Sequence, residues 1–344
     1  MPVRVHSSRF SQEHPHTPPR TNEKELSCEP IRIGLVNSMP EAAFKATEDQ
    51  FLSLLNSASD GIPVELSLYV LRGTPIAVAN CDHAASRYAH VDELWNQTLD
   101  GLIVTGTEPT TAALKDEPYW KSFTQLIDWS RSNTLSAVWS CLAAHAAILH
   151  MDGIERRRNP VKHFGVFQCH RVSDDRLLKG TASSPFIPHS RWNGVAEQDL
   201  MAHGYQILTR TAGAEVDTFI KQEGSLFVFF QGHPEYATDT LLREYRRDIG
   251  RFLRDDANAY PRLPHGYFDS AAERAFSSLQ ENASSLHRDQ LLAGIASAME
   301  SITIENTWQA TAVRIYSNWL EYLRTCKETN QTADNLNTPR AACQ

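Results

Sequence analysis

Short apolar runs in the first two thirds of the chain alternate with segments in which apolar side chains recur every three or four residues. The apolar runs are rich in β-branched and aromatic residues and predict buried strands. They occupy residues 31–36, 64–70, 101–106, 135–139 and 226–230. The periodic segments predict helices over residues 47–55, 119–131 and 142–150, with Thr47 as the N-cap of the first. This alternation predicts an α/β fold, in which a parallel sheet is flanked by helices on both faces.

The two ends of the chain have a different character. Residues 1–29 are rich in His, Pro, Ser and charge and are expected to form a disordered tail, as are residues 331–344. Between them we expect an α/β domain over residues 30–265 and a helical appendage over residues 266–330 that completes the same domain. Residues 306–327 of the appendage predict an amphipathic helix that packs on the core or on a partner. Its aromatic residues lie on more than one face, which favours a homodimer; they are Trp308, Tyr316, Trp319 and Tyr322.

Composition narrows the classes of function. The 344 residues are 41% hydrophobic and carry a net charge of -8, so a substantial core is expected and a nucleic-acid-binding face is not. No apolar run reaches the roughly 18 residues of a membrane span, and the first residues lack the apolar stretch of a secretory signal. We therefore expect a cytoplasmic protein without a membrane partner. The six cysteines form no CxxC pair and the fourteen histidines no HExxH motif, so neither disulfides nor a metal site are predicted.

Cys141 stands where a predicted strand runs directly into a predicted helix, in the sequence Trp-Ser-Cys-Leu-Ala-Ala. Small residues after the cysteine permit a tight turn, the nucleophile elbow, which lifts the side chain above the sheet edge. There the next backbone N–H can face a developing oxyanion, and the positive end of the helix dipole stabilises a thiolate. A buried structural cysteine is the competing interpretation. A base close to Cys141 would favour the catalytic interpretation over the structural one.

His233 and Glu235 provide a base of this kind. They follow the strand predicted at residues 226–230, in the sequence Gly-His-Pro-Glu. A histidine can take the proton of a thiol, and a carboxylate can hold the imidazole in the required tautomer and orientation. Ligands of parallel sheets bind beyond the carboxyl ends of the strands, where both Cys141 and His233 are expected. This favours a catalytic pair over a surface histidine in a turn.

The order of these motifs resembles a known family. A cysteine elbow followed about 90 residues later by His-Pro-Glu after a strand is the layout of class I glutamine amidotransferases. More closely, the chain resembles the homoserine O-succinyltransferase or acetyltransferase family, which shares that flavodoxin-like fold. The matching stretches run in order through most of residues 31–325; they are 37–40 with 47–51, 100–106, 119–120 with 128–130, Cys141, 164–167, 188–191, 232–236, 244–248 and 318–322.

The resemblance implies an enzyme whose catalytic domain spans residues 30–265 and whose reaction is a ping-pong acyl transfer. Cys141 would take the acyl group from an acyl-CoA and form a thioester. The hydroxyl of homoserine, deprotonated by His233, would attack that thioester while Glu235 orients His233. The product would serve methionine or sulfur amino acid biosynthesis. The partners implied are small molecules, with acyl-CoA as a co-substrate and no bound cofactor.

Further positions match substrate-binding residues of the family. Arg247 matches the arginine expected to hold the amino acid carboxylate, a role that suits a bidentate guanidinium. Ser190 and Lys162 are further, weaker candidates for the substrate pocket. The family lysine that faces the oxyanion has no direct match, because the segment before Thr47 is two residues longer than usual, and Lys45 is the nearest lysine.

The acyl donor is predicted from one position. Thr110 aligns with the residue that lines the acyl pocket in the family, where glutamate favours acetyl-CoA and glycine leaves room for succinyl. Threonine carries no charge to repel a carboxylate, so succinyl-CoA is favoured. Glu108, two residues away, could restore the repulsion if the loop is shifted.

Three alternatives remain open at this point. Family members usually carry a tryptophan and then glycine or alanine just after the nucleophile, whereas this chain has Leu142-Ala143. The acceptor could therefore be another hydroxy amino acid such as serine. The same three catalytic residues could instead release ammonia from glutamine. The chain could also be a non-catalytic scaffold built on an enzyme fold.

Overall fold

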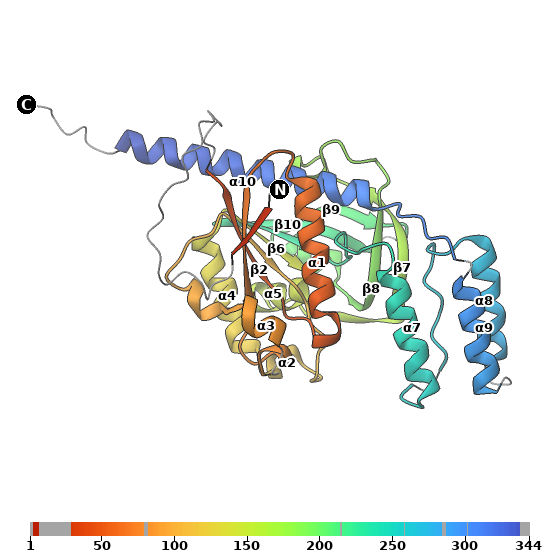
Figure 1. The fold of residues 1–344 in the computed structure, drawn as a ribbon. Coiled ribbons are helices and arrows are strands. Elements are labelled where there is room, and N and C mark those ends of the chain that lie inside the picture. Colours follow the sequence, from red (N-terminus) through yellow and green to blue (C-terminus); the bar gives the residue numbers. More distant parts are fainter. Residues whose placement is uncertain are drawn as a thin grey trace, which may run out of the picture.

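The computed structural model describes residues 3–6, 29–78, 82–213, 215–257, 259–283, 287–300 and 302–337. These residues fold around one mixed sheet with helices on both faces (Figure 1). None of the helices in these ranges is both long enough and apolar enough to cross a membrane.

One half of the sheet is parallel and carries Cys141 at its edge. In spatial order its strands are β1 (Val3–His6), β3 (Val64–Val70), β2 (Ile31–Val36), β5 (Gly101–Val104), β6 (Ser136–Ser140) and β11 (Ser225–Phe230). The short β4 (Ala89–His90) pairs with β3. The five predicted strands are confirmed in this half, because the runs of buried apolar residues suit strands that are covered on both faces.

The other half of the sheet is antiparallel, so the prediction of a parallel sheet was wrong there. Its strands continue the order as β10 (Val216–Glu223), β9 (Gln206–Thr211), β7 (Arg157–Arg171) and β8 (Phe186–Gly194). The physical reason is visible between β10 and β11, where Gly224 at φ +77° is the whole connection. A parallel pair would need a crossover of a dozen or more residues.

Helices cover both faces of the parallel half. One face is covered by α4 (Trp120–Asn133) and α5 (Leu142–Asp152), and the other by α1 (Glu41–Ala58) and α10 (Gln309–Asn337). Alternation along β5 shows how the two layers arise: Leu102 and Val104 pack with α4 and α5, whereas Ile103 packs with α1 and α10. The short helices are α2 (Pro75–Val78), α3 (Asp82–Arg87) and α6 (Glu197–Ala202).

Two predictions about the N-terminal part were wrong. Val3–His6 forms β1 and pairs with β3, although it falls within the expected disordered tail; residues 7–28 lie outside the described part of the chain. α1 begins at Glu41, directly after Pro40, so Thr47 is a buried residue inside the helix and not its cap.

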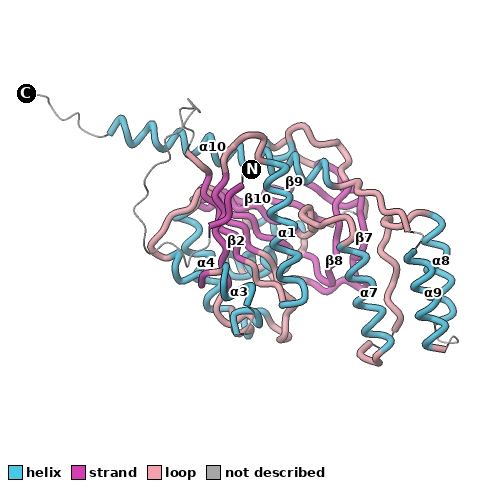
Figure 2. The backbone as a smooth tube through the Cα atoms, in the orientation of Figure 1, coloured by secondary structure: helices cyan, strands magenta, loops and turns pink. Residues whose placement is uncertain are grey.

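Helices also form within residues 266–330, where the appendage was expected. α8 (Ser270–Asn282) and α9 (Arg288–Glu300) lie side by side beyond α7 (Thr240–Leu253), at one end of the molecule (Figure 2). A third apolar cluster joins them to α7 and includes Tyr245, Phe276, Leu291 and Trp308.

The C-terminal helix α10 packs along α1 and the sheet, as its amphipathic pattern predicts. It continues to Asn337, past residue 330 where the second tail was expected to begin. Trp308, Tyr316 and Trp319 are buried in the core, and Tyr322 is partly buried. Core packing thus accounts for the aromatic side chains that favoured a homodimer, and the oligomeric state stays a prediction.

Candidate active site

Cys141 occupies a sharp turn between β6 and α5. Its backbone has φ +52° and ψ −109°, a conformation rare for a residue with a side chain. The turn is fixed from both sides: the Cys141 N–H donates to the Phe230 carbonyl at 2.7 Å, and the Cys141 carbonyl accepts from Ala144 at 3.0 Å. The turn expected from the sequence is therefore present, and Cys141 is the first residue beyond the sheet edge.

Gly106 makes room for this turn. It follows β5, and a Cβ at this position would lie 2.9 Å from Cβ and 3.0 Å from the backbone nitrogen of Leu142. The loop after β5 therefore lies against the first turn of α5. The N–H of Leu142 belongs to the group of helix-start donors that have no partner within the helix.

His233 and Glu235 lie across from Cys141, beyond the end of β11. His233 Nδ1 is 2.9 Å from Glu235 Oε1, and the Glu235 side chain is buried. Ser140, the residue before Cys141, donates its hydroxyl to the same Glu235 oxygen at 3.1 Å. Since Nδ1 faces Glu235, the remaining nitrogen Nε2 is available to Cys141, whose negative charge acts on His233.

The charges around His233 favour its protonated form. Burial lowers the pKa of His233, but the negative charges of Cys141 and Glu235 more than offset this effect, and the pKa is raised well above its usual value. A thiolate beside an imidazolium is the state in which a cysteine nucleophile is most reactive at neutral pH.

The expected substrate residues Ser190, Lys162 and Arg247 gather around one carboxylate, Glu244 of α7. The hydroxyl of Ser190 donates to Glu244, Lys162 Nζ lies 3.9 Å away and Arg247 lies 3.7 Å away. Asp248, one turn further along α7, contacts Lys162 at 3.1 Å and Arg247 at 3.0 Å. Residues four apart share one face of a helix, which explains why both carboxylates meet the same cations.

Glu244 and Tyr236 were not assigned a role from the sequence, although both stand in motifs quoted for the resemblance. The Tyr236 hydroxyl donates to Glu244 Oε1 at 2.7 Å, and its ring stacks on His233. Only the fold shows that these two motifs touch.

Lys45 lies apart from this cluster. Its side chain is 66% exposed and forms an ion pair with Asp49 one turn along α1. It lines a groove of about 440 Å³ between α1 and the segment that leads into α7, together with Ala237 and Arg243. The described contacts of Lys45 therefore do not include the Cys141–His233 pair.

Thr110 lies on the loop after β5, where its position is fixed by Glu117. The backbone N–H and the hydroxyl of Thr110 donate to Glu117 at 2.7 and 2.9 Å, and Thr111 repeats the pattern at 2.7 and 2.8 Å. Burial raises the pKa of Glu117, but these four hydrogen bonds outweigh it and the pKa is lowered. Glu108 is turned toward Arg251, 3.4 Å away.

Arg156 is a further charged residue near the site that the sequence did not single out. It is partly buried, and its charge acts on Tyr119, Cys141 and Glu117. The run Arg156-Arg157-Arg158 is typical of solvated surface, and no sequence signal separates the first arginine from its neighbours.

Similarity to known proteins shows the family of this chain. Residues 9–330 match the family model described as homoserine O-succinyltransferase. A homoserine O-succinyltransferase of Rhodopseudomonas palustris is 44% identical over 302 residues, which cover 88% of this chain and 90% of that protein. The chain belongs to the homoserine O-succinyltransferase family. It is therefore an acyltransferase by family, as the resemblance implied.

Other members of the homoserine O-succinyltransferase family match over a similar length. The homoserine O-succinyltransferase of Bradyrhizobium japonicum is 42% identical, with 85% of this chain and 90% of that protein covered. Among solved structures, a glutamine amidotransferase from Thermotoga maritima is 12% identical and has a TM-score of 0.49, with 86% of this chain and 99% of that one covered.

Proposed function

We propose that this protein transfers a succinyl group from succinyl-CoA to the hydroxyl of L-homoserine, in the biosynthesis of methionine. The observation that carries the proposal is the strained turn at Cys141 opposite the His233–Glu235 pair. Family membership supports the acceptor and the acyl group, since the relatives are named homoserine O-succinyltransferase.

The first half of the reaction forms the acyl-enzyme. The Cys141 thiolate attacks the thioester carbonyl, and the C–S bond to Cys141 forms as the C–S bond to CoA breaks. CoA leaves as a thiol with the proton that the His233 imidazolium supplies. The raised pKa of His233 suits this acid role. The N–H of Leu142, at the start of α5, is the donor best placed to stabilise the oxyanion.

The second half consumes the acyl-enzyme. Neutral His233 takes the hydroxyl proton of homoserine as the oxygen attacks the acyl carbon, and the bond to Cys141 breaks to restore the thiolate. Glu235 holds the imidazole so that Nε2 faces the reacting atoms. Arg247 supplies the cation for the amino acid carboxylate, and Glu244 supplies an anion for its ammonium group.

The uncharged Thr110 supports succinyl-CoA as the donor. The Glu117 hydrogen bonds hold Thr110 in place, and Glu108 is paired with Arg251 away from that loop position. The side chain of residue 110 itself therefore carries no charge that would repel a succinyl carboxylate, and the oxygens of the neighbouring Glu117 are occupied by hydrogen bonds from Thr110 and Thr111.

The deciding experiment separates the half reactions. With succinyl-CoA alone, the protein should release about one equivalent of CoA, and mass spectrometry should find a succinyl adduct on Cys141. Adding homoserine should restore turnover, while serine in its place tests the other acceptor. Release of ammonia from glutamine without CoA release would refute the proposal in favour of a glutaminase. No selective alkylation of Cys141 by iodoacetamide near neutral pH would favour a scaffold.

A further inference from the structure

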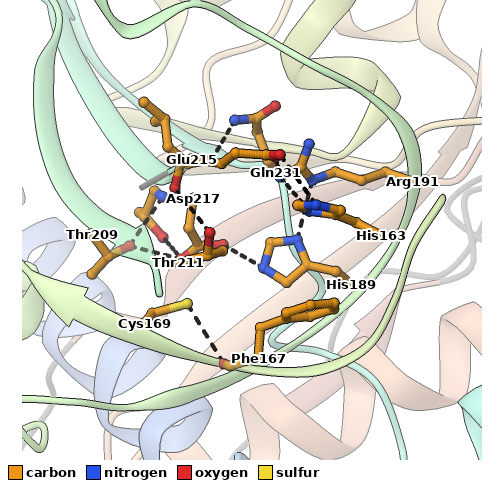
Figure 3. A network of polar contacts seen from close by, with 12 residues as sticks. His163, Phe167, Cys169, His189, Arg191, Thr209, Thr211, Glu215, Asp217 and Gln231 are labelled. Carbon is orange, nitrogen blue, oxygen red and sulfur yellow. Dashed lines mark hydrogen bonds and ion pairs between the residues drawn. The ribbon is translucent and has the colours of Figure 1, made fainter. Parts of the chain in front are cut away.

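A largely buried polar network joins strands β7 to β10 (Figure 3), and Gly232, the residue before His233, lies against it. Its centre is His189 of β8, whose Nε2 lies 3.2 Å from Oδ1 of Asp217 on β10. Both side chains have no exposed surface. Among the described residues neither of these two atoms forms a hydrogen bond that meets the angular criteria, so their mutual approach at 3.2 Å is the polar contact that the structure gives them. The second oxygen of Asp217 accepts from Thr209 at 2.7 Å and from Thr218 at 2.9 Å.

Arg191 fixes the tautomer of His189. Its Nε lies 3.2 Å from His189 Nδ1, and since a guanidinium can only donate, Nδ1 must be the acceptor. The neutral ring then carries its proton on Nε2, toward Asp217. Burial lowers the pKa of His189 to about 4, although Asp217 opposes this. A neutral imidazole therefore connects a buried carboxylate to a buried guanidinium.

Cys169 of β7 completes the cluster and raises the question of a metal. The sulfur of Cys169 and one donor atom each of His189 and Asp217 all lie within 4.8 Å of one another, the spacing of metal ligands. A metal would need the lone pair of His189 Nε2, but that atom carries the proton because Nδ1 accepts from Arg191. The hydrogen-bonding pattern thus favours a pair of protein groups over a metal site.

The pair lies directly beneath the residue before His233. A Cβ on Gly232 would be 2.6 Å from Ile187 Cγ2 and 2.9 Å from both His189 Nε2 and Asp217 Oδ1, so the Gly232 backbone rests on the pair and on Ile187. The His233 N–H donates to the carbonyl of Pro188, next to His189, at 2.7 Å.

Gln231 holds residues 231–233 in place through further hydrogen bonds. The Gln231 N–H donates to the Asp217 carbonyl at 2.9 Å. Its side chain contacts His145 of α5 at 2.9 Å and donates to the carbonyl of Val216. Residues 231–233 are therefore held between β8, β10 and the nucleophile helix.

We propose that the His189–Asp217 pair is a positioning device that sets the place of His233 relative to Cys141, by supporting Gly232 from below. This inference rests on the proposed role of His233 as acid and base. Removal of the imidazole would leave Oδ1 of the buried Asp217 without its polar contact. Residues 231–233 would then move, so that water could reach this oxygen. A displacement of about 1 Å at a catalytic group can cost about 100-fold in rate.

Two substitutions at position 189 test the proposal. His189→Leu should lower kcat about 100-fold and leave KM for both substrates within about threefold, because successive side chains of a strand point to opposite faces, so His189 points away from the pocket side of Ser190. It should also slow the alkylation of Cys141 by iodoacetamide near neutral pH, because a displaced His233 no longer lies beside the thiolate. His189→Gln keeps an amide N–H where Nε2–H was and should restore kcat to within about tenfold of the parent. A His189→Leu protein with the parent's kcat and alkylation profile would overturn the proposal.

Matched variants distinguish a positioning role of the pair from a metal site and from a general effect on the network. Cys169→Ala and His163→Gln change the same network away from Gly232 and should leave kcat and alkylation near the parent values. If Cys169→Ala is as damaging as His189→Leu and elemental analysis finds a metal in the parent, the pair is a metal site and the proposal fails.

Gly232→Ala disturbs the contact from the loop side and should reproduce the loss of kcat at constant KM, even where His189→Leu does not fold. Full activity of Gly232→Ala would also overturn the proposal.

Alkylation requires no acyl donor, so the two proposals can fail separately. A parent protein that shows the His189-dependent alkylation profile but does not acylate homoserine refutes the proposed function alone.

Discussion

The imidazole of His233 lies stacked on the phenol ring of Tyr236, with ring centroids 4.2 Å apart and planes inclined by 16°. The hydroxyl of Tyr236 donates to Glu244, which also accepts from Ser190. One tyrosine therefore joins the proposed base to the pocket proposed for the amino acid, and the position of the imidazole depends on that pocket.

Tyr236 offers a direct test of this connection. Tyr236→Phe keeps the stacked ring and removes only the bond to Glu244, so kcat should fall less than about tenfold. Tyr236→Leu also removes the stack and should lower kcat further at a similar KM. Steady-state kinetics of both variants checks the order, and an equal loss in the two would show that the stack is unimportant.

The proposed catalytic residues should differ in the size of their effects. Cys141→Ala should abolish acyl transfer, and His233→Ala should lower kcat by about 10³-fold, since it removes the acid and base. Glu235→Gln should cost less because the imidazole remains and only its orientation suffers. If Glu235→Gln has the parent's kcat, Glu235 does not have the role proposed here.

Thr110→Glu should reverse the preference for the acyl donor. A carboxylate at this position would lie beside Glu117 and repel the free carboxylate of succinyl-CoA, but not acetyl-CoA. We expect the ratio of kcat/KM for succinyl-CoA over acetyl-CoA to fall at least about tenfold, equivalent to about 1.4 kcal/mol. Thr110→Ser is the control and should keep the parent's ratio. A parent enzyme that prefers acetyl-CoA tenfold would contradict the succinyl assignment.

Stability should decline steeply as the pH falls from about 6.5 toward 4. Burial lowers the pKa of both His145 and His189 to about 4, so both rings are neutral in the folded state and take up protons on unfolding. Two such groups give a slope of up to about 2.7 kcal/mol per pH unit. His233 has a raised pKa, so its contribution is present below pH 6.5 and is lost only at higher pH.

Urea unfolding at pH 7, 6 and 5 measures this slope. His189→Gln should remove about half of it, whereas a substitution at the exposed His203 should not change it. A parent slope near zero between pH 6.5 and 5 would show that the two buried rings do not titrate as described.

Trp319 should be among the most costly residues to remove. It is buried where α10 crosses β5, its indole donates to Ser136 at 2.9 Å, and a Cβ on Gly101 would lie 2.9 Å from its ring. Trp319→Ala should lower the free energy of unfolding by about 3–5 kcal/mol. Trp192→Ala is the control, because that side chain is 44% exposed and should cost under about 1 kcal/mol. Chemical denaturation of the two variants is the measurement.

The parallel half of the sheet and the turn at Cys141 were predictable from the chain alone. Strands that are covered on both faces need continuous apolar runs, such as residues 226–230, and these runs are visible in one dimension. Each strand end is also local, so the positions of Cys141, His233 and Glu235 beyond the strands follow from the sequence next to them.

Only the tertiary structure decided which distant residues meet. β7 to β10 carry mixed polar and apolar residues and form through antiparallel pairing, so their polar side chains acquire partners only once the strands are in register. The His189–Asp217 pair and the stack of Tyr236 on His233 depend on that register and on the loop that ends β11. Lys45 shows the converse, because its place in the sequence suggested the active site while helix α1 turns its side chain to solvent. Local patterns determine where a strand ends, whereas the pairing of strands far apart in the chain determines what lies beside that end.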